Sequence, residues 1–222
     1  MFIGHFALGM AAKKFAPKTS LATLFLSVQF ADLLWPVLLI LGVEHVRIAP
    51  GITVLTPLDF YDYPISHSLV MGVVWGLLLA LIYYAMRRDR TGAAVIGAGV
   101  LSHWVLDVVT HRPDMPVMPG SQLHAGMGLW NHPIAAILLE SLMYIAGIII
   151  YVRSTWAVDR TGTYAFWALA IFLAISWIAA LTSVPPNESA LGWGGLSLWL
   201  IIGWGYWIDK HRTGSAGTVT QR

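Results

Sequence analysis

ISHSLVMGVVWGLLLALIYYAM, residues 65–86, is an almost uninterrupted apolar run that ends at the charged segment RRDR, residues 87–90. A helix needs about 20 mostly apolar residues to cross the hydrocarbon core of a bilayer, and this run reaches that length. In lipid the backbone must satisfy its own hydrogen bonds, and the run is far longer than a barrel strand. We therefore predict a transmembrane helix here.

Five further stretches have the same length and apolar character. They are 19–43, 91–111, 132–152, 163–184 and 189–208. Across the chain 57% of the residues are hydrophobic and 11% are charged, against roughly 25% charged in a typical soluble domain. The sequence predicts an all-α integral membrane protein, a bundle of about six transmembrane helices. A single polytopic membrane domain would cover 1–212, followed by a polar tail over 213–222.

The loops between these stretches differ in charge. Eleven of the 13 Lys and Arg residues lie in alternate segments that include both chain ends, whereas the opposite loops hold only Arg47 and Arg112. Cytoplasmic loops collect Lys and Arg, so we expect both termini in the cytoplasm. Segments 44–64, 112–131 and 185–188 are then expected outside.

The first apolar stretch, residues 1–15, is too short to span a bilayer. It is expected either to lie in the interface as an amphipathic helix or to enter from the cytoplasmic side as a re-entrant half-helix. The second arrangement requires that its inner end be buried in protein or face a wet cavity.

Composition excludes several classes of function. The basic residues form short clusters between apolar runs, which gives nucleic acid no basic face to follow. The chain has no Cys, so disulfides and thiolate metal sites are excluded. The expected partners are membrane lipids, with a lipid-like substrate as a further candidate. The oligomeric state stays open.

The third predicted helix carries the densest group of polar residues, in SHWVLDVVTH, residues 102–111. His103, Asp107 and His111 follow one another at intervals of four, which places them on one helical face. Ionisable side chains inside a membrane helix are costly and therefore need a function. Imidazole and carboxylate are ligands for Zn, Mn and Fe, so this face predicts a divalent metal site. The alternative is an interhelical hydrogen-bond network without metal.

Other acidic groups fall at a similar depth. Counting 1.5 Å per residue from the outer ends, Asp32, His103 and Glu140 all lie roughly 12–17 Å deep. Glu140, or Asp62 from the outer loop, is expected to act as a general base. Arg112 follows His111 directly, and we expect both to contact substrate, with Arg112 suited to an anionic group such as phosphate.

Several short motifs resemble the YdjM-like family, bacterial inner-membrane proteins described as metal-dependent hydrolases. The resemblance covers about the first 115 residues. The matching motifs are Gly4-His5-Phe6, Asp32 in the first apolar run, Ser66-His67-Ser68-Leu69 and Leu101-Ser102-His103-Trp104-Val105-Leu106-Asp107. The resemblance implies a metal set of His5, Asp32, His67, His103 and Asp107, and a location in the bacterial inner membrane. The family usually shows two Asp where this chain has Asp32 alone, so the number of metal ions stays open.

Three functions are compatible with the sequence. The first is a membrane-embedded metal-dependent hydrolase, with Zn as the expected ion and Mn or Fe as alternatives. It would act on a lipid or lipid-linked ester or phosphoester from the outer half of the bilayer. The second is a small proton- or ion-coupled transporter, because Asp, Glu and His chains also build proton relays. The third is a non-catalytic membrane scaffold whose polar cluster fixes helix packing.

Overall fold

The protein is an all-α membrane bundle. The computed structural model describes residues 1–214. Within that range four helices are long and apolar enough to cross a membrane: α5 (Leu69–Arg87), α6 (Arg90–Thr110), α7 (Pro133–Ser154) and α8 (Arg160–Thr182). Their outward faces carry exposed Leu, Ile, Val and Trp side chains, as expected where lipid is the solvent.

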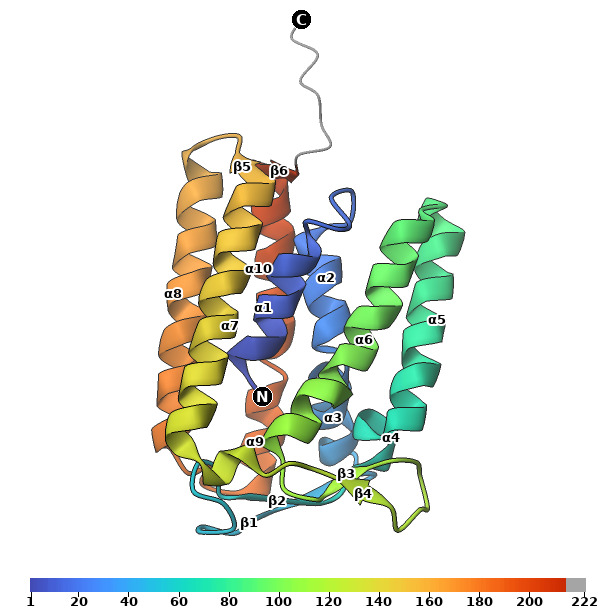
Figure 1. Cartoon of the computed structure of the whole chain (residues 1–222), viewed down its shortest axis with the longest axis vertical. Helices are drawn as coiled ribbons and strands as arrows, with labels where there is room; N and C mark the ends of the chain where they lie inside the picture. Colours follow the sequence, from blue (N-terminus) through green and yellow to red (C-terminus); the bar gives the residue numbers. More distant parts are fainter. Residues whose placement is uncertain (215–222) are drawn as a thin grey trace, which may run out of the picture.

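Shorter elements complete the chain (Figure 1). They are α1 (Ile3–Ala12), α2 (Leu21–Val28), α3 (Phe30–Ile40), β1 (His45–Ile48), β2 (Leu58–Asp62), α4 (Pro64–His67), β3 (Met115–Pro116), β4 (His124–Ala125), the 3₁₀ turn η1 (Leu129–Asn131), β5 (Thr155–Ala157), α9 (Glu188–Gly195), α10 (Leu198–His211) and β6 (Arg212–Gly214). We call the end of the bundle that carries β1 to β4 the hairpin end, and the end that carries β5 and β6 the tail end (Figure 1).

The first predicted span, 19–43, is not one straight helix. It is divided at Gln29 into α2 and α3, which are bent by 60° against each other. The break has a tertiary cause, because the carbonyl of Val28 accepts a hydrogen bond from Nδ1 of His103 at 2.8 Å. Pro36 lies within α3, after the break.

The last predicted span, 189–208, is also divided, into α9 and α10. The end of α9 is the glycine-rich segment GWGG, residues 192–195, which has weak helix propensity. A Cβ on Gly195 would lie 2.5 Å from the ring of Pro36, so the glycine permits a close contact between α9 and α3. The prediction of six continuous spans is therefore wrong. The described chain has four long helices, or five spans if α2 and α3 count as one.

The N-terminal stretch adopts the half-helix arrangement. Helix α1 is buried between α7, α2 and α6, with Ile3, Phe6 and Met10 in the main apolar core. It approaches α7 closely at Gly147, where a Cβ would lie 2.6 Å from the carbonyl oxygen of Ala7. Its first residues lie inside the bundle rather than at a surface (Figure 1). The far end of α1 approaches the tail end (Figure 1), and the expectation of cytoplasmic termini stays a prediction.

Small sheets close both ends of the bundle. At the hairpin end β1 pairs with β2 and β3 with β4, all antiparallel. At the tail end β5 pairs with β6, so the first residues of the predicted polar tail form a strand. The rest of that tail, 215–222, lies outside the described residues. Below this sheet Asp209 accepts hydrogen bonds from the backbone N–H of Leu21 and Ala22 and so caps α2.

Candidate metal centre

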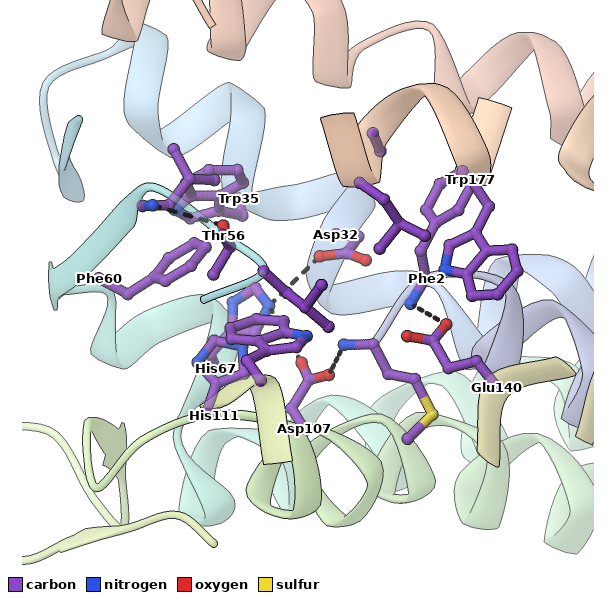
Figure 2. A pocket seen from close by; sticks show the side chains of 16 residues that line it. Phe2, Asp32, Trp35, Thr56, Phe60, His67, Asp107, His111, Glu140 and Trp177 are labelled. Carbon is purple, nitrogen blue, oxygen red and sulfur yellow. Dashed lines mark hydrogen bonds and ion pairs between the residues drawn. The ribbon is translucent and has the colours of Figure 1, made fainter. Parts of the chain in front are cut away.

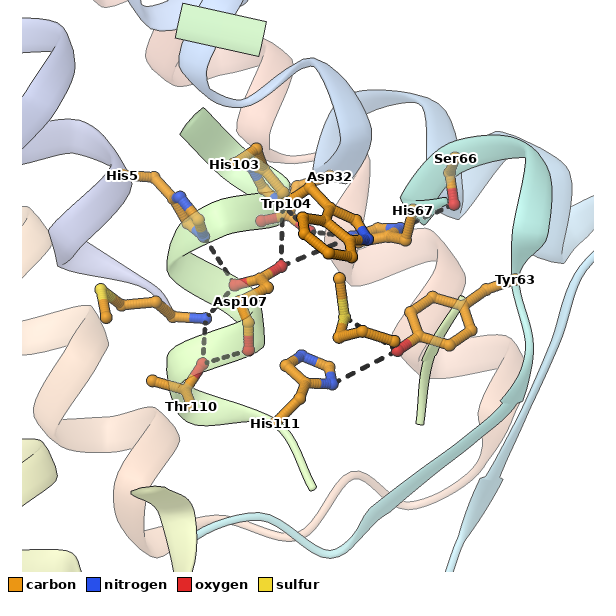
Figure 3. A network of polar contacts seen from close by, with 12 residues as sticks. His5, Asp32, Tyr63, Ser66, His67, His103, Trp104, Asp107, Thr110 and His111 are labelled. Atoms are coloured by element: carbon orange, nitrogen blue, oxygen red, sulfur yellow. Dashed lines mark hydrogen bonds and ion pairs between the residues drawn. The ribbon is translucent and has the colours of Figure 1, made fainter. Parts of the chain in front are cut away.

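Five of the sequence-predicted residues meet inside the bundle, towards the hairpin end. They come from four helices: His5 from α1, Asp32 from α3, His67 from α4, and His103 and Asp107 from α6 (Figure 3). All except Asp32 are buried, and the Asp32 side chain is 26% exposed. These buried His and Asp groups can hold a metal ion.

The distances between ligand atoms fit a single ion. Nε2 of His103 lies 3.1 Å from Oδ2 of Asp107 and 3.7 Å from Oδ1 of Asp32. Nε2 of His67 lies 3.4 Å from the same Asp32 oxygen and 4.0 Å from Oδ2 of Asp107. Tetrahedral bonds of 2.0–2.1 Å place neighbouring ligand atoms about 3.3 Å apart, which is within this range. Asp32, His67 and His103 therefore offer three ligand atoms that all lie within 4.8 Å of one another, and Asp107 lies beside them in a second such set with His5 and His103.

The orientation of His103 points to a cation. Its Nδ1 donates to the Val28 carbonyl, which can only accept, so a neutral ring carries a lone pair on Nε2. Nε2 is buried and has no hydrogen-bond partner among residues 1–214. A lone pair that faces two carboxylates is repulsive, so Nε2 is expected to carry either a proton or a metal ion. The His103 ring is thus prepared to accept a metal ion at Nε2.

A buried acid orients His67 in the same way. Oε2 of Glu44 accepts a hydrogen bond from the Ser66 hydroxyl at 2.5 Å, and Oε1 accepts from the backbone N–H groups of Ile65 and Ser66. Since the Ser66 proton is used in this bond, Ser66 Oγ accepts from Nδ1–H of His67 at 2.7 Å. Nε2 of His67 is then free to bind metal. Glu44 precedes β1 in the outer loop, and its sequence context gave no signal of this role.

We expect Glu44→Gln to weaken metal binding by about 10–100-fold, the usual effect of losing a partner that orients a ligand. The introduced amide can donate to Ser66 Oγ, and the Ser66 hydroxyl can then donate to an unprotonated Nδ1 of His67. The proton of the His67 ring would then be on Nε2, the nitrogen that faces the metal position. Metal affinity measured by competition with a chelator dye tests this. Glu188→Gln, an exposed acid at the start of α9, is the control. Equal metal affinity in wild type and Glu44→Gln would contradict the proposed chain of hydrogen bonds from Glu44 through Ser66 to His67.

The second oxygen of Asp107 faces the N-terminal segment. Oδ1 lies 3.0 Å from Nε2 of His5 and accepts a hydrogen bond from the Met1 amino group at 2.6 Å. The His5 ring stacks parallel on the His103 ring, with centroids 3.8 Å apart. His5 therefore lies on the far side of Asp107 and His103 from His67, where it supports both of them.

Glu140 lies beside these groups but is engaged in holding α1. Its Oε2 accepts hydrogen bonds from the backbone N–H of Phe2 at 2.9 Å and of Gly4 at 3.4 Å. The first N–H groups of a helix have no partner within the helix, and in a bilayer they cannot turn to water. Glu140 satisfies them and places a negative charge at the positive end of the helix dipole. Glu140 also lines the cavity beside the ligands, and its predicted role as general base stays a prediction.

A cavity of about 240 Å³ opens next to the ligands (Figure 2). Asp32, His67 and Asp107 contribute to its wall, together with His111. Most of the remaining wall is apolar or aromatic and includes Trp35, Phe60, Trp130 and Trp177. The metal position thus has a space beside it for a small reacting group.

His111 is the polar side chain in this wall that is best placed to move a proton. It follows the last residue of α6, and its ring packs against Phe60 and Trp130, with centroids 5.0 and 4.2 Å away. Its Nδ1 donates to Oδ1 of Asp114 at 3.1 Å. The Asp114 carboxylate is held in turn by Nε of Arg112 at 3.0 Å. This leaves Nε2 of His111 as the free nitrogen.

Two predicted residues lie away from the cavity. Asp62 is at the surface of the hairpin end, where it pairs with His45 at 2.9 Å and is 46% exposed, so its predicted role as general base is not supported. Arg112 pairs with Asp59 of β2 and with Asp114 and so ties the two outer segments together. These ion pairs use Nε and Nη2 of Arg112, and its predicted contact with substrate stays a prediction. The nearby Tyr63 hydroxyl stays protonated, because burial raises its pKa well above the usual value.

None of the protein-family models, curated proteins or solved structures compared with the chain matches it. The resemblance to the YdjM-like family therefore stays a prediction.

Proposed function

We propose that the protein is a membrane-embedded metal-dependent hydrolase that cleaves an ester or phosphoester of a lipid. The observation that supports it most is the paired orientation of His67 and His103. Each ring has its Nδ1 committed to a partner outside the site, and each turns Nε2 towards Asp32 and Asp107.

The chemistry of the ligands favours one divalent ion, with Zn first and Mn or Fe as alternatives. Two carboxylates balance a charge of +2, which matters in a low-dielectric interior. Imidazole nitrogens and carboxylate oxygens are ligands that zinc commonly takes in proteins. When bound, the ion would supply Lewis acidity, polarising the carbonyl or phosphoryl oxygen and activating water. In this proposal His5 and Glu140 position the site. The side chains that bind the ion are those of Asp32, His67, His103 and Asp107.

His111 is proposed as the general base and acid. In ester cleavage its Nε2 takes one proton from the attacking water as the new bond to the carbonyl carbon forms. The same proton then passes to the leaving alkoxide as the carbon–oxygen bond breaks, so that an acid and an alcohol result. Asp114 holds the ring in the required tautomer through Nδ1. Phe60 and Trp130 fix the plane of the ring and exclude bulk water.

The site lies where a lipid can reach it. It lies inside the bundle towards the hairpin end (Figure 1) and is surrounded by helices whose outer faces are apolar. The distribution of Lys and Arg favours a hairpin end outside the cell, and the family resemblance suggests the bacterial inner membrane. The substrate would then come from the outer half of that bilayer.

Metal removal tests the proposal directly. We expect purified protein in lipid nanodiscs to hydrolyse lipid esters or phosphoesters, to lose this activity after dialysis against a chelator, and to regain it with Zn, Mn or Fe. Release of fatty acid or phosphate is the measurement. Proteoliposomes examined for proton or ion flux provide the comparison with the transporter hypothesis. Metal-independent flux without any hydrolysis would overturn the proposed function.

A further inference from the structure

A second space adjoins the metal centre. It is a groove of about 350 Å³ between α3 and α9, and its wall is formed by side chains of these two helices, the start of α10 and the prolines of the preceding loop. Apart from Asp32, the groove is lined by apolar residues and glycine. Asp32 and Trp35 line both this groove and the cavity described above, so the two spaces meet at a proposed metal ligand.

The groove is open to the side of the bundle. Gly194 in its wall is exposed, and a Cβ built there would meet no atom of residues 1–214 within 4 Å. Its neighbours in the wall are Pro186 from the loop and Leu191 and Leu198 from the helices. An apolar groove that opens sideways between membrane helices is solvated by lipid chains rather than by water. A polar soluble molecule would gain little from such a surface.

Trp35 adds a polar feature where the two spaces meet. Its side chain is nine-tenths buried, and its indole N–H has no acceptor among residues 1–214. A buried N–H without an acceptor is costly, and indole nitrogens usually find a partner. An oxygen of a ligand at this junction would supply one. The ligand that fits both spaces therefore has a long apolar part and an oxygen-rich end.

We propose that this groove binds one fatty acyl chain of the substrate, with the carboxyl end of that chain directed to Asp32 and Trp35. The inference builds on the proposed function and specifies it: the bond to be cleaved is next to an acyl chain. A substrate with a long chain would bind through the groove, whereas one with a short chain would occupy the cavity alone.

Photolabelling tests the groove without any turnover. The probe is palmitic acid with a diazirine at its methyl end, added to the full-length protein in nanodiscs, and the labelled peptides are identified by mass spectrometry. We expect label on α3 and on residues 186–198. Gly194→Leu places a side chain in the groove and should lower this labelling about tenfold, the effect of displacing about two buried methylene groups.

Gly203→Leu is the matched control. Gly203 lies in α10, is exposed, and likewise has no atom of the described residues within 4 Å of a built Cβ, but it is outside the groove. It should leave the labelling unchanged. Equal labelling of Gly194→Leu and wild type, or label spread evenly over lipid-facing helices such as α5, would overturn the acyl-chain site. Failure of the hydrolase proposal would appear separately, as the absence of metal-dependent hydrolysis in the wild-type protein.

Discussion

His103→Ala is expected to lose the bound metal and to reduce hydrolysis to the background rate, while the protein still inserts and folds. Nε2 of His103 lies 3.1 Å from Asp107 and 3.7 Å from Asp32, closer to Asp107 than Nε2 of His67, the other ring that approaches both carboxylates. Asp107→Ala should have the same effect, because Oδ2 of Asp107 completes the set. Elemental analysis of the detergent-purified variants and the lipid hydrolysis assay are the two measurements.

A control variant distinguishes the loss of a metal-binding histidine from the loss of a histidine elsewhere in the chain. His124→Ala removes an exposed imidazole from β4 that bonds only to the nearby Gln122 carbonyl within residues 1–214. It should keep both metal and activity. Circular dichroism and gel filtration should give the wild-type result for all three variants. If His103→Ala and Asp107→Ala kept their metal, the proposed centre would be wrong.

The second large effect is expected from His111→Asn. This change removes the free nitrogen that faces the cavity but leaves the four metal-binding side chains in place. We expect kcat to fall by about 10²–10⁴-fold, the usual contribution of a general acid–base group. Metal content should stay at the wild-type level. This combination distinguishes a proton-transfer residue from a metal ligand.

Asp114→Asn gives an independent test of the pair formed by His111 and Asp114. The amide can donate to Nδ1 of His111 and so favour the wrong tautomer, with the proton on Nε2. Activity should fall, although less than in His111→Asn, and the metal should again remain. A His111→Asn variant that lost its metal, or that kept full kcat, would exclude the proposed role of His111.

The sequence predicts part of this site because membrane helices make ionisable residues conspicuous. Asp32, His103 and Asp107 were identifiable as charges inside apolar runs, and the spacing of four residues in α6 placed His103 beside Asp107. The same spacing placed His111 on that face. In the structure α6 ends at Thr110, so the His111 ring instead lies in the cavity wall, bonded to Asp114.

Other features depend on contacts between distant residues. The break in the first span arises because His103 takes the Val28 carbonyl, and no local pattern around Gln29 signals it. Glu44 lies in a loop where acids are usually solvated, so its role became visible only through Ser66 and His67. The role of Glu140 could be assigned only once α1 was known to enter the bundle.

X-ray absorption spectroscopy at the metal edge tests the central claim most directly. For wild-type protein loaded with Zn, we predict a first shell of nitrogen and oxygen donors at about 2.0–2.2 Å. Outer-shell scattering should correspond to two imidazole rings, and one of these should disappear in His103→Ala. A spectrum without imidazole scattering, such as that of a fully hydrated ion, would contradict a metal centre built from His67, His103, Asp32 and Asp107.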